Sequence, residues 1–517
     1  MKLINFLIRN SEKFPKKIAL IYEDKKITYN EFYEKVRKLS YGFEKIGIKK
    51  GNKIALILNN SLEFIYSFYA AANLGATLVP INISLSKKDV SNQLLLSKSK
   101  YIISWSSYLD NLFKHNQDLK TTNKKNCIVV DNSKKKYSNF NILMKYAPDN
   151  YFLGSHKFTK KTDLIFGLTS GSTSKPKIVV FSQETKIKRS IHAKKLYKLN
   201  SKEKIIVSTP MYHSISLRLI TLPILLGATC IIIEKYTNKN WLRLIKKNKV
   251  TFCILVASQI ESIYQIFLKK NNFNIYSMKS IVSCCSHLNT KIKYEFAKKI
   301  KCTFYDTYGA SEVGTITNLN VTKEINKKHT LGKIVPGVKL LFKSESGKIK
   351  NHIAGEILCK SENVFSGYFN KKYKKKIFHK KYFYTGDVGY KDKSNYLILT
   401  GRKKDIIITG GINVFASDVE KVLNSHPKIK DSAVIGLKDS RLGEVVFAVI
   451  TINKRMKINF NDLNLYCAKN LADYQIPFSY DIVNSLPRGN LNKISKFILR
   501  KQYDNYDLSK SIRKILK

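Results

Sequence analysis

Apolar and polar positions alternate through most of the chain in the pattern of strands and helices that follow one another. Residues 53–58 form a short β-rich run, residues 63–75 predict a helix that ends at Gly75, and residues 77–82 predict a second strand. Such a unit is usually a right-handed parallel crossover. Further apolar runs of the same kind lie between lysine-rich helical stretches, at 205–208, 228–233, 251–256 and 280–283. The pattern predicts an α/β fold with mainly parallel sheets flanked by helices.

The pattern changes after about Leu399. Residues 401–411 predict a strand closed by two glycines, and residues 416–427 predict a helix with Ser417 as N-cap and Glu420 completing a capping box. Two strands and a helix follow, at 432–437, 445–452 and 460–471. This length suffices for a small α+β domain. We place the boundary at 402–405 and expect a large domain of residues 1–401 and a small, mobile domain of residues 402–517.

Composition adds a charge question to this picture. Among 517 residues, 44% are apolar, which is enough to build more than one core, and 93 Lys and Arg face 37 Asp and Glu, a formal charge of +56. Nucleic-acid binding could explain such a charge. The lysines, however, spread over the whole length instead of forming one arm. We therefore interpret the charge as a general preference for Lys, expect no specific nucleic-acid partner, and expect a monomer or homodimer.

Nothing in the apolar runs predicts a membrane protein. The N-terminal apolar patch is interrupted by Arg9, Glu12 and Lys13, and the longest uncharged stretch, 219–233, is shorter than the roughly 18–20 residues that cross a bilayer. The 8 cysteines include no C-x-x-C pair, and several lie inside apolar runs. They fit buried free thiols better than disulfides or zinc. We expect a soluble, cytoplasmic protein with no transmembrane segment.

The segment T-S-G-S-T-S-K-P-K at 169–177 is the strongest sign of chemistry. Predicted strands flank it, at 164–168 and 178–181. Phosphate binding needs backbone N–H groups in a concave loop, hydroxyl donors and a nearby cation. All three are available from Gly171, from the hydroxyls and from two lysines: Thr169, Ser170, Ser172, Thr173, Lys175 and Lys177. The loop is not a Walker A motif. On chemistry alone, a phosphate loop and an ordinary polar hairpin loop are both open.

This loop resembles the phosphate loop of the adenylate-forming superfamily, which includes acyl-CoA synthetases, adenylation domains and luciferases. Four further motifs similar to those of the superfamily follow in order: Y-G-A-S-E at 308–312, T-G-D at 385–387, G-R-K-K-D at 401–405 and L-P-R-G-N-L-N-K at 486–493. Weaker echoes lie at 355–357 (G-E-I) and 367–370 (G-Y-F-N). The resemblance covers essentially the whole chain and implies a large adenylation domain with a small C-terminal domain.

The resemblance implies a ligase that activates a carboxylate with Mg-ATP, releases pyrophosphate and passes the acyl group from its adenylate to a thiol. The loop would hold the phosphates, Glu312 would ligate Mg²⁺, and Ser311 would contact the α-phosphate. Tyr308 would stack on adenine, while Asp387 and Arg402 would hold the ribose. The remaining nucleotide-binding positions that the resemblance implies are Ser286, Gly309, Lys404 and Asn413.

Three residues would serve the chemistry and the domain motion. Lys493 matches the lysine that bridges the substrate carboxylate and the nucleotide oxygens, so we expect it to act in adenylation. Lys404 matches the hinge about which the small domain swings between the two half-reactions. His213 would form the wall between the nucleotide and acyl sites. Relatives that activate amino acids resemble Phe-Asp there, whereas His213 and Ser214 offer no acid to pair with an ammonium, which favours a fatty or aromatic acid.

Several positions depart from the superfamily pattern. Ser174 and Ile178 replace two glycines of the loop, and Cys284 and Cys285 replace a Gly-Gly pair, where side chains leave less room for a long substrate. We expect an AMP-forming acid–CoA ligase that uses ATP, Mg²⁺ and CoA. Two alternatives are open: a stand-alone ligase that loads the phosphopantetheine of a free-standing acyl carrier protein, and a non-catalytic nucleotide- or nucleic-acid-binding relative.

Overall fold

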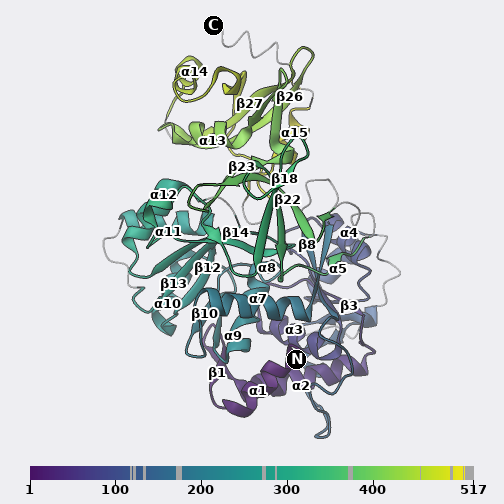
Figure 1. The fold of residues 1–517 in the computed structure, drawn as a ribbon. Coiled ribbons are helices and arrows are strands. Elements are labelled where there is room, and N and C mark those ends of the chain that lie inside the picture. The colour runs from purple at the N-terminus through teal and green to yellow at the C-terminus, as the bar shows by residue number, and fades with distance from the viewer. Residues whose placement is uncertain are drawn as a thin grey trace.

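The chain forms a large body and a smaller unit above it that contains the C-terminal elements (Figure 1). A computed structural model gives this architecture, and it describes residues 1–116, 119, 124–131, 136–169, 177–269, 275–285, 288–370, 377–453, 456–489, 493–504 and 506. The α/β class, with large sheets flanked by helices and a smaller C-terminal α+β part, confirms the fold predicted from the sequence.

A first large sheet has 9 strands among the described residues. Its central strands are parallel, with antiparallel strands at both edges. In spatial order they are β16 (Lys333–Ile334), β15 (Gly314–Asn320), β14 (Thr303–Ala310), β13 (Ser280–Cys284), β12 (Phe252–Val256), β10 (Lys204–Val207), β11 (Thr229–Ile232), β1 (Ile18–Tyr22) and β2 (Lys25–Thr28). The apolar runs predicted as strands between residues 205 and 283 are confirmed as β10 to β13.

A second large sheet has 8 strands among the described residues. Its order is β20 (Gly367–Tyr368), β9 (Lys177–Ser182), β8 (Asp163–Thr169), β4 (Thr77–Pro80), β3 (Lys53–Leu56), β5 (Tyr101–Ser104), β6 (Cys127–Val129) and β7 (Ser138–Asn139). β3 and β4 pair in parallel, as predicted for the strand–helix–strand unit. β8 and β9, on either side of the predicted phosphate loop, are antiparallel.

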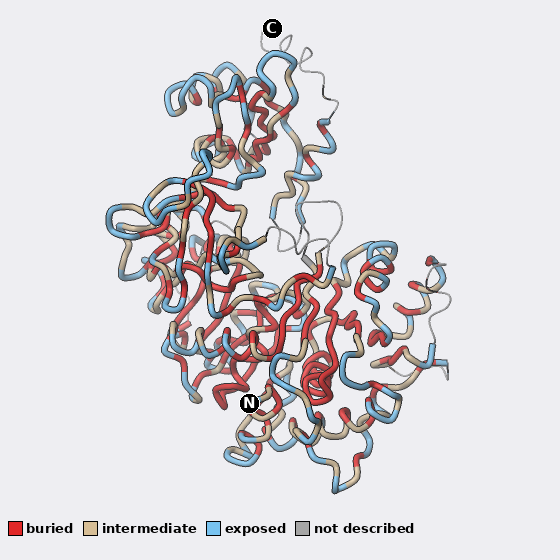
Figure 2. The backbone as a smooth tube through the Cα atoms, turned by 45° about the vertical axis from the view of Figure 1, so that its right-hand side comes forward, coloured by how far each residue is buried: buried red, intermediate tan, exposed pale blue. Residues whose placement is uncertain are grey.

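Helices fill the space between the two sheets and cover their outer faces (Figure 1). Between the sheets lie α1 (Ile4–Lys13), α2 (Tyr29–Lys45), α3 (Leu62–Leu74), α7 (Gln183–Leu196), α8 (Ser214–Leu219) and α9 (Leu222–Leu226). The outer faces carry α10 (Asn238–Asn248), α11 (Ala257–Lys269), α12 (Thr290–Lys299), α4 (Lys87–Ser97) and α5 (Ser106–Lys114), and α6 (Phe140–Leu143) packs on α2. Figure 2 shows the buried strands and central helices that this layering produces. Parallel strands buried on both faces explain the continuous apolar runs of the sequence.

A third, antiparallel sheet joins the large body to the smaller unit. Its strands are β18 (Ile349–Lys350), β17 (Val338–Lys343), β19 (Gly355–Ser361), β22 (Tyr382–Lys391) and β21 (Phe378–His379), with β23 (Leu397–Arg402) on the free side of β22. The hydrophobic pattern did not resolve this sheet. Its register matters for function, because β22 and β23 place Asp387 opposite Arg402.

The smaller unit is built on a fourth sheet. Its strands are β25 (Ile412–Phe415), β24 (Ile406–Thr409), β27 (Gly443–Ile452), β26 (Ile429–Asp439) and β28 (Ser479–Ile482), and its helices are α13 (Ala416–Ser425), α14 (Phe460–Ala468) and α15 (Lys496–Gln502). A short 3-10 turn, Lys403–Asp405, lies between β23 and β24. The strands predicted at 432–437 and 445–452 and the helix predicted at 460–471 are confirmed as β26, β27 and α14. The exact domain division stays a prediction.

The capping box predicted for α13 is wrong. The N-cap position is Phe415, not Ser417, and the Ser417 hydroxyl donates to the carbonyl of Thr400 on β23. Glu420 does not turn back to the helix start, because its carboxylate accepts from the Val434 N–H and pairs with Lys496 at 2.7 Å. Tertiary partners outside the helix therefore take both side chains away from the local motif.

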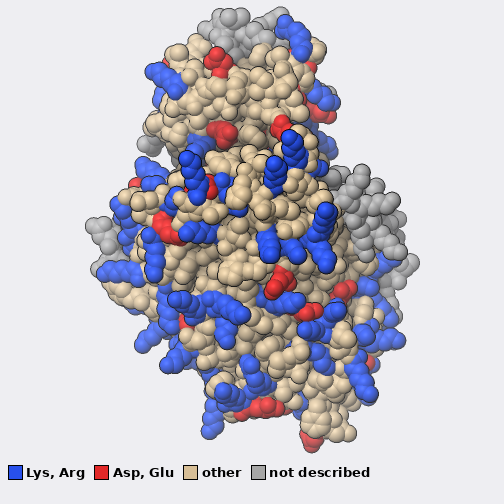
Figure 3. All heavy atoms as spheres, viewed as in Figure 1, with Lys and Arg blue, Asp and Glu red and all other residues tan. Residues whose placement is uncertain are grey.

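Two other expectations concern the surface and the thiols. Lys and Arg side chains are scattered over both parts of the visible face in Figure 3, in agreement with their even spread along the sequence. All 8 cysteines are free, most of them buried, as predicted. Within the described residues, no helix combines the length and apolarity that a membrane crossing requires.

Candidate active site

The predicted phosphate loop leaves and re-enters the second sheet at one end of the β8–β9 hairpin. The two strands pair up to Thr169 and Lys177, which bound the loop. The Lys177 ammonium lies 5.7 Å from the centre of the Tyr368 ring. Six predicted nucleotide-binding residues lie outside the described residues: Ser170, Gly171, Ser172, Thr173, Lys175 and Ser286. Their roles stay predictions.

Glu312 lies in the turn between β14 and β15 and is held by its neighbours. Its Oε1 accepts a hydrogen bond from the Tyr368 hydroxyl at 2.8 Å, and its backbone carbonyl accepts from the Phe365 N–H at 2.7 Å. Tyr368 belongs to β20, which pairs with β9. The tyrosine therefore ties Glu312 to the strand that follows the phosphate loop.

The Glu312 carboxylate keeps capacity for a metal. Among the described residues, no basic nitrogen lies within 4.0 Å of it, and only part of its oxygen capacity is used by Tyr368. A lone carboxylate that shares Mg²⁺ with nucleotide phosphates is a common arrangement for this hard cation. The described part of the chain contains no cluster of three or more metal-ligating side chains.

The hairpin that carries Ser311 and Glu312 depends on glycine. A Cβ atom at Gly309 would lie 2.2 Å from the Gly314 carbonyl oxygen, so a side chain there would force the two strands apart. Arg189 of α7 fixes the turn, because its Nη2 donates to the Ser311 carbonyl at 2.8 Å. The sequence motif at 308–312 thus encodes a tight turn as well as its functional side chains.

Asp387 contacts two other predicted nucleotide residues, Tyr308 and Arg402. Its Oδ2 accepts from the Tyr308 hydroxyl at 2.6 Å, and its Oδ1 pairs with Arg402 Nε at 3.0 Å. Burial, reinforced by the Asp387 charge, raises the pKa of Tyr308 well above its ordinary value, so the phenol stays protonated and remains a donor. Each carboxylate oxygen of Asp387 retains a lone pair that a further hydroxyl can use.

Lys493 reaches this cluster from the smaller unit. Although the residue is exposed as a whole, desolvation around its ammonium lowers its pKa, while the charges of Cys285, Cys284 and Asp387 oppose that shift. These interactions bring the ammonium within electrostatic reach of Asp387. Lys493 and Asp387, which come from different parts of the chain, therefore lie close enough for their charges to interact.

Two neighbouring thiols, Cys284 at the end of β13 and Cys285 directly after it, lie within electrostatic range of Lys493. Cys285 has φ of +77°, in the left-handed region where glycine is favoured, so the Gly-Gly replacement is strained by about 1 kcal/mol. A hydrogen bond from the Cys284 thiol lowers the pKa of Cys285 to about 7, and the charges of Lys493 and Arg218 act in the same direction against burial. The pKa of Cys284 is raised well above its usual value.

His213 precedes the first residue of α8 and packs against Tyr212, with ring centres 4.5 Å apart. Burial lowers the pKa of His213 to about 4, so its ring is neutral at pH 7. A neutral, mostly enclosed ring suits the predicted wall of an acyl site and offers no positive charge to a substrate. Its catalytic role stays a prediction.

The hinge residues and Asn413 make other contacts in this arrangement. Asp405 pairs with Arg500 of α15 at 2.7 Å, and desolvation lowers the pKa of Lys404. The Asn413 amide donates to Glu345. Among the described contacts, none joins Lys404 or Asn413 to Asp387, so their proposed roles in the nucleotide site stay predictions.

Sequence reasoning missed the residues that support this site. Tyr368 could have been noticed from the G-Y-F-N echo at 367–370. This segment begins in β20, which pairs with β9, the strand that follows the phosphate loop. Arg189 and Arg218 carry no such signal, because isolated basic residues in a chain with 93 Lys and Arg do not stand out. Only the packing of α7 and α8 brings these two cations to the hairpin.

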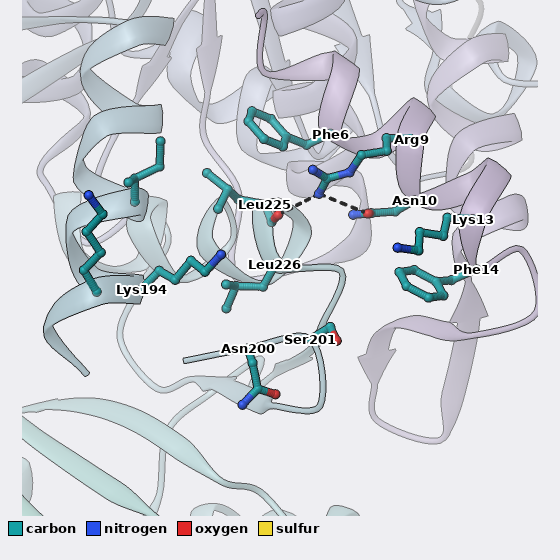
Figure 4. A pocket seen from close by; sticks show the side chains of 12 residues that line it. Phe6, Arg9, Asn10, Lys13, Phe14, Lys194, Asn200, Ser201, Leu225 and Leu226 are labelled. Carbon is teal, nitrogen blue, oxygen red and sulfur yellow. Dashed lines mark hydrogen bonds between the residues drawn. The ribbon is translucent and has the colours of Figure 1, made fainter. Parts of the chain in front are cut away.

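A surface pocket of about 630 Å³ lies away from these residues, between α1, α7 and α9 (Figure 4). Apolar side chains such as Phe6 and Leu226 form part of its wall, with Arg9, Lys13 and Lys194 also lining it. The Arg9 guanidinium already donates to the Leu225 carbonyl at 2.9 Å. No predicted site residue lines this pocket, and it adds nothing to the chemistry described above.

Comparison with known proteins places the chain in context. A family model described as AMP-binding enzyme matches residues 7–369, and one described as AMP-binding enzyme C-terminal domain matches residues 418–493. The 2-succinylbenzoate–CoA ligase of Bacillus subtilis (strain 168) is 25% identical, over 95% of this chain and 96% of that protein. The long-chain-fatty-acid–CoA ligase of the same organism is 27% identical, over 98% of this chain and 95% of that protein.

Solved structures agree with these sequence matches. The o-succinylbenzoate CoA synthetase (MenE) from Bacillus subtilis, in complex with the acyl-adenylate intermediate OSB-AMP, matches with a TM-score of 0.85 and 25% identity, over 97% of this chain and 98% of that chain. ATP-bound MatB from Rhodopseudomonas palustris has the same fold, with a TM-score of 0.87, 22% identity, and coverage of 98% of this chain and 99% of that chain.

Proposed function

Because this chain belongs to the family of AMP-binding enzymes, we propose that it activates a carboxylic acid with Mg-ATP and transfers the acyl group to CoA. The observation that carries the proposal is the cluster that Asp387 forms with the Tyr308 hydroxyl at 2.6 Å and with Arg402 Nε at 3.0 Å. The ligases for an aromatic acid and for long-chain fatty acids to which the chain is similar support an acid–CoA ligase.

In the first step, a carboxylate oxygen of the acid attacks the α-phosphorus of ATP, the bond to the bridging oxygen breaks, and pyrophosphate leaves. Lys493 would hold the attacking carboxylate beside the phosphate and offset the negative charge that grows there. Asp387 would accept the ribose hydroxyls on the lone pairs that Tyr308 and Arg402 leave open. Holding the sugar in this way would fix the α-phosphate relative to Lys493.

Glu312 would hold Mg²⁺ together with phosphate oxygens of ATP. When bound, the cation would supply charge that offsets the phosphates during the displacement. The hydrogen bond from Tyr368 would orient the carboxylate without using its full capacity. Arg189, by its bond to the Ser311 carbonyl, would keep the turn in place.

In the second step, the CoA sulfur attacks the acyl carbonyl, the bond to the AMP oxygen breaks, and AMP leaves. On this proposal, Lys493 would withdraw after adenylation, before a thiol enters. A rotation about residues 402–405 would accomplish this, at the expense of the Arg500–Asp405 pair and the Asn413–Glu345 hydrogen bond.

A pyrophosphate-release assay tests the proposal. Purified full-length protein would receive ATP and Mg²⁺ with fatty, aryl and amino acids in turn, followed by CoA or a phosphopantetheinylated carrier protein. We expect acid-dependent pyrophosphate release and a CoA thioester detected by mass spectrometry. Transfer to the carrier alone would contradict the choice of CoA, and the absence of pyrophosphate release with every acid would contradict the enzyme itself.

A further inference from the structure

Two adjacent cysteines at the end of β13 differ from the other thiols of the protein. Cys284 and Cys285 are free and only partly buried, whereas most of the 8 cysteines are buried. Cys302 is also partly buried, but no second cysteine lies beside it in the chain. Oxidants reach partly exposed thiols, while buried thiols in apolar surroundings are inert. The pair at 284–285 is therefore the place where two neighbouring thiols can react together.

The backbone at this pair is strained. Cys284 is the last residue of β13 and lies opposite Val256 of β12, and its Sγ lies 3.7 Å from the Leu255 carbonyl oxygen. Cys285 follows with φ of +77°, in the left-handed region that suits glycine better than a residue with a side chain. Such strained positions persist only where the surrounding structure holds them, and they cluster at functional sites. The strain at Cys285 therefore points to a use for its thiol.

The two thiols differ in reactivity. The hydrogen bond from Cys284 lowers the pKa of Cys285 to about 7, and the charges of Lys493 and Arg218 act in the same direction against burial. The hydrogen bond between the two thiols, followed by burial, raises the pKa of Cys284 well above its usual value. At pH 7 a large fraction of Cys285 is therefore thiolate, the form that attacks an oxidant, while Cys284 keeps its proton. A low-pKa thiol beside a second thiol that can resolve it is the arrangement of redox-sensing cysteines.

A disulfide between adjacent cysteines is easily reduced. A trans peptide bond joins Cys284 to Cys285, so their Cα atoms lie about 3.8 Å apart, whereas bridged cysteines usually have Cα atoms about 4.4–6.8 Å apart. A bond between the two sulfurs is therefore strained, and strained disulfides have the higher reduction potentials of labile, regulatory ones. An ordinary thiol reductant would return such a bond to two thiols, so the oxidation is reversible.

The pair lies next to the strand that carries part of the nucleotide site. Ser283, the residue before the pair, accepts a hydrogen bond on its carbonyl from the Thr307 hydroxyl at 2.9 Å. Thr307 directly precedes Tyr308, whose hydroxyl donates to Asp387 at 2.6 Å. Closing a ring between the two sulfurs would move the backbone at 284–285 and, through Ser283 and Thr307, the position of Tyr308. Oxidation of the pair is therefore coupled by direct contacts to the residue that holds Asp387.

We propose that Cys284 and Cys285 form a reversible oxidation site, at which a hydroperoxide converts the two thiols to a disulfide and lowers the activity of the enzyme. The Cys285 thiolate attacks one peroxide oxygen, the O–O bond breaks, hydroxide leaves, and a sulfenic acid forms. The Cys284 sulfur then attacks the sulfenic sulfur, the S–O bond breaks, and water leaves with the Cys284 proton as the S–S bond forms. Two electrons pass from the thiols to the peroxide. The loss of activity rests on the proposed function, whereas the oxidation itself does not.

The test follows the thiols and the activity in the same samples. Full-length protein, first reduced and then freed of reductant, would be treated with a small excess of hydrogen peroxide at pH 7 and blocked with an alkylating reagent. Peptide mass spectrometry should show that the peptide with both cysteines has lost two hydrogen atoms and resists alkylation, and that dithiothreitol reverses this. Acid-dependent pyrophosphate release should fall several-fold on oxidation and recover on reduction.

Variants assign a step to each thiol. Cys284→Ser should stop at the sulfenic acid of Cys285, which dimedone traps, because the resolving thiol is absent. Cys285→Gly suits the left-handed backbone and should lose the response to peroxide, measured against its own untreated activity. Cys302→Ser is the matched control and should respond as the wild type does. If a variant fails to fold in a thermal melt, phenylarsine oxide decides on the wild type, because one arsenic bound by both thiols, with loss of water, requires the two sulfurs to lie within reach of each other.

Each outcome bears on one part of the two proposals. A wild-type protein that accumulates sulfenic acid at Cys285 without a disulfide would overturn the role of Cys284. Oxidation of Cys302 ahead of the pair would overturn the oxidation site as a whole. A disulfide that leaves pyrophosphate release unchanged would overturn its effect on activity and leave the ligase intact. If the untreated protein releases no pyrophosphate with any acid, the ligase is overturned, and the mass spectra still decide whether the pair is an oxidation site.

Discussion

The two ends of the site differ in how their charges are matched. At the nucleotide end, Asp387 has one partner on each oxygen, Tyr308 and Arg402, and Glu312 accepts from Tyr368. On α7 and α8, by contrast, Lys186, Arg189 and Arg218 have no carboxylate within 4.0 Å among the described residues. The first set is held in place by partners within the protein and keeps oxygen lone pairs for a ligand. The second set has no carboxylate partner among the described residues.

This difference separates groups that the protein itself holds in place from cations without a described counter-charge. Paired and hydrogen-bonded groups hold their positions before substrate arrives, so little reorganisation is needed when a nucleotide binds. On the proposed function, ATP would be held by this prearranged framework.

Removing the group that joins the two ends should have the largest effect. We expect Lys493→Ala to reduce acid-dependent pyrophosphate release at least roughly 100-fold, because no other described cation would then hold the reacting carboxylate at the α-phosphate. Thioester formation from supplied acyl adenylate should stay within about twofold. Lys469→Ala, an exposed charge in the same domain, is the control. Equal loss of both half-reactions would show that the lysine is not specific to adenylation.

Removing Asp387, which holds Tyr308 and Arg402, should weaken the binding of ATP. Asp387→Ala leaves Tyr308 and Arg402 without their acceptor, so we expect KM for ATP to rise roughly 10- to 100-fold with a smaller change in KM for the acid. Tyr308→Phe removes one of the two partners and should have a weaker effect in the same direction. Steady-state kinetics at saturating acid would measure both. A change confined to KM for the acid would show that Asp387 acts on acid binding and not on nucleotide binding.

Altering the boundary between the ends should change selectivity more than affinity for ATP. His213→Ala would open the predicted wall of the acyl site, and we expect the ranking of acids to shift by roughly tenfold towards bulkier members. Because the pKa of His213 is lowered to about 4, the kcat/KM profile between pH 6 and 9 should show no ionisation from this ring. An unchanged acid ranking would place the ring outside the pocket.

The smallest effect should appear at the thiol of Cys285. With its pKa lowered to about 7, Cys285 should be alkylated faster as pH rises through 7, because the thiolate is the reactive form. Arg218→Gln and Lys493→Ala should each slow alkylation at pH 7 by a few-fold, since loss of a nearby positive charge raises the thiol pKa. Peptide mass spectrometry would follow the modification.

Cys302 is the matched control, because burial raises its pKa to about 12 and neither cation acts on it. Its alkylation should be slow at pH 7 and equal in all variants. A Cys285 rate that does not respond to either substitution would show that neither cation acts on this thiol.

Several parts of the fold could be predicted because they depend on local pattern. β3, α3 and β4 follow from apolar runs of strand and helix length, and parallel burial makes those runs continuous. The capping box at Ser417 failed because its two side chains found partners in β23 and β26 instead. The antiparallel sheet from β17 to β23 was not resolved, since short strands joined by polar turns give a weak signal.

The candidate site also has one part that the sequence predicts and another part that only the fold reveals. The motifs at 308–312 and 385–387 could be read directly, because the turn and its side chains are contiguous in the chain. Tyr368, Arg189 and Arg218 act on those motifs from distant segments. Their residue types are common in this sequence, and only their neighbours in the folded chain make them important.

The sequence by itself determined the layered α/β body, the separate C-terminal unit and the residue types needed for nucleotide chemistry, because periodicity and short motifs are local properties of the chain. The tertiary structure decided that Tyr308 and Arg402 share Asp387, that Lys493 lies within electrostatic range of Asp387, and that no carboxylate among the described residues lies within 4.0 Å of Arg218. These relations join residues far apart in the chain, and charge matching depends on distances that only packing fixes.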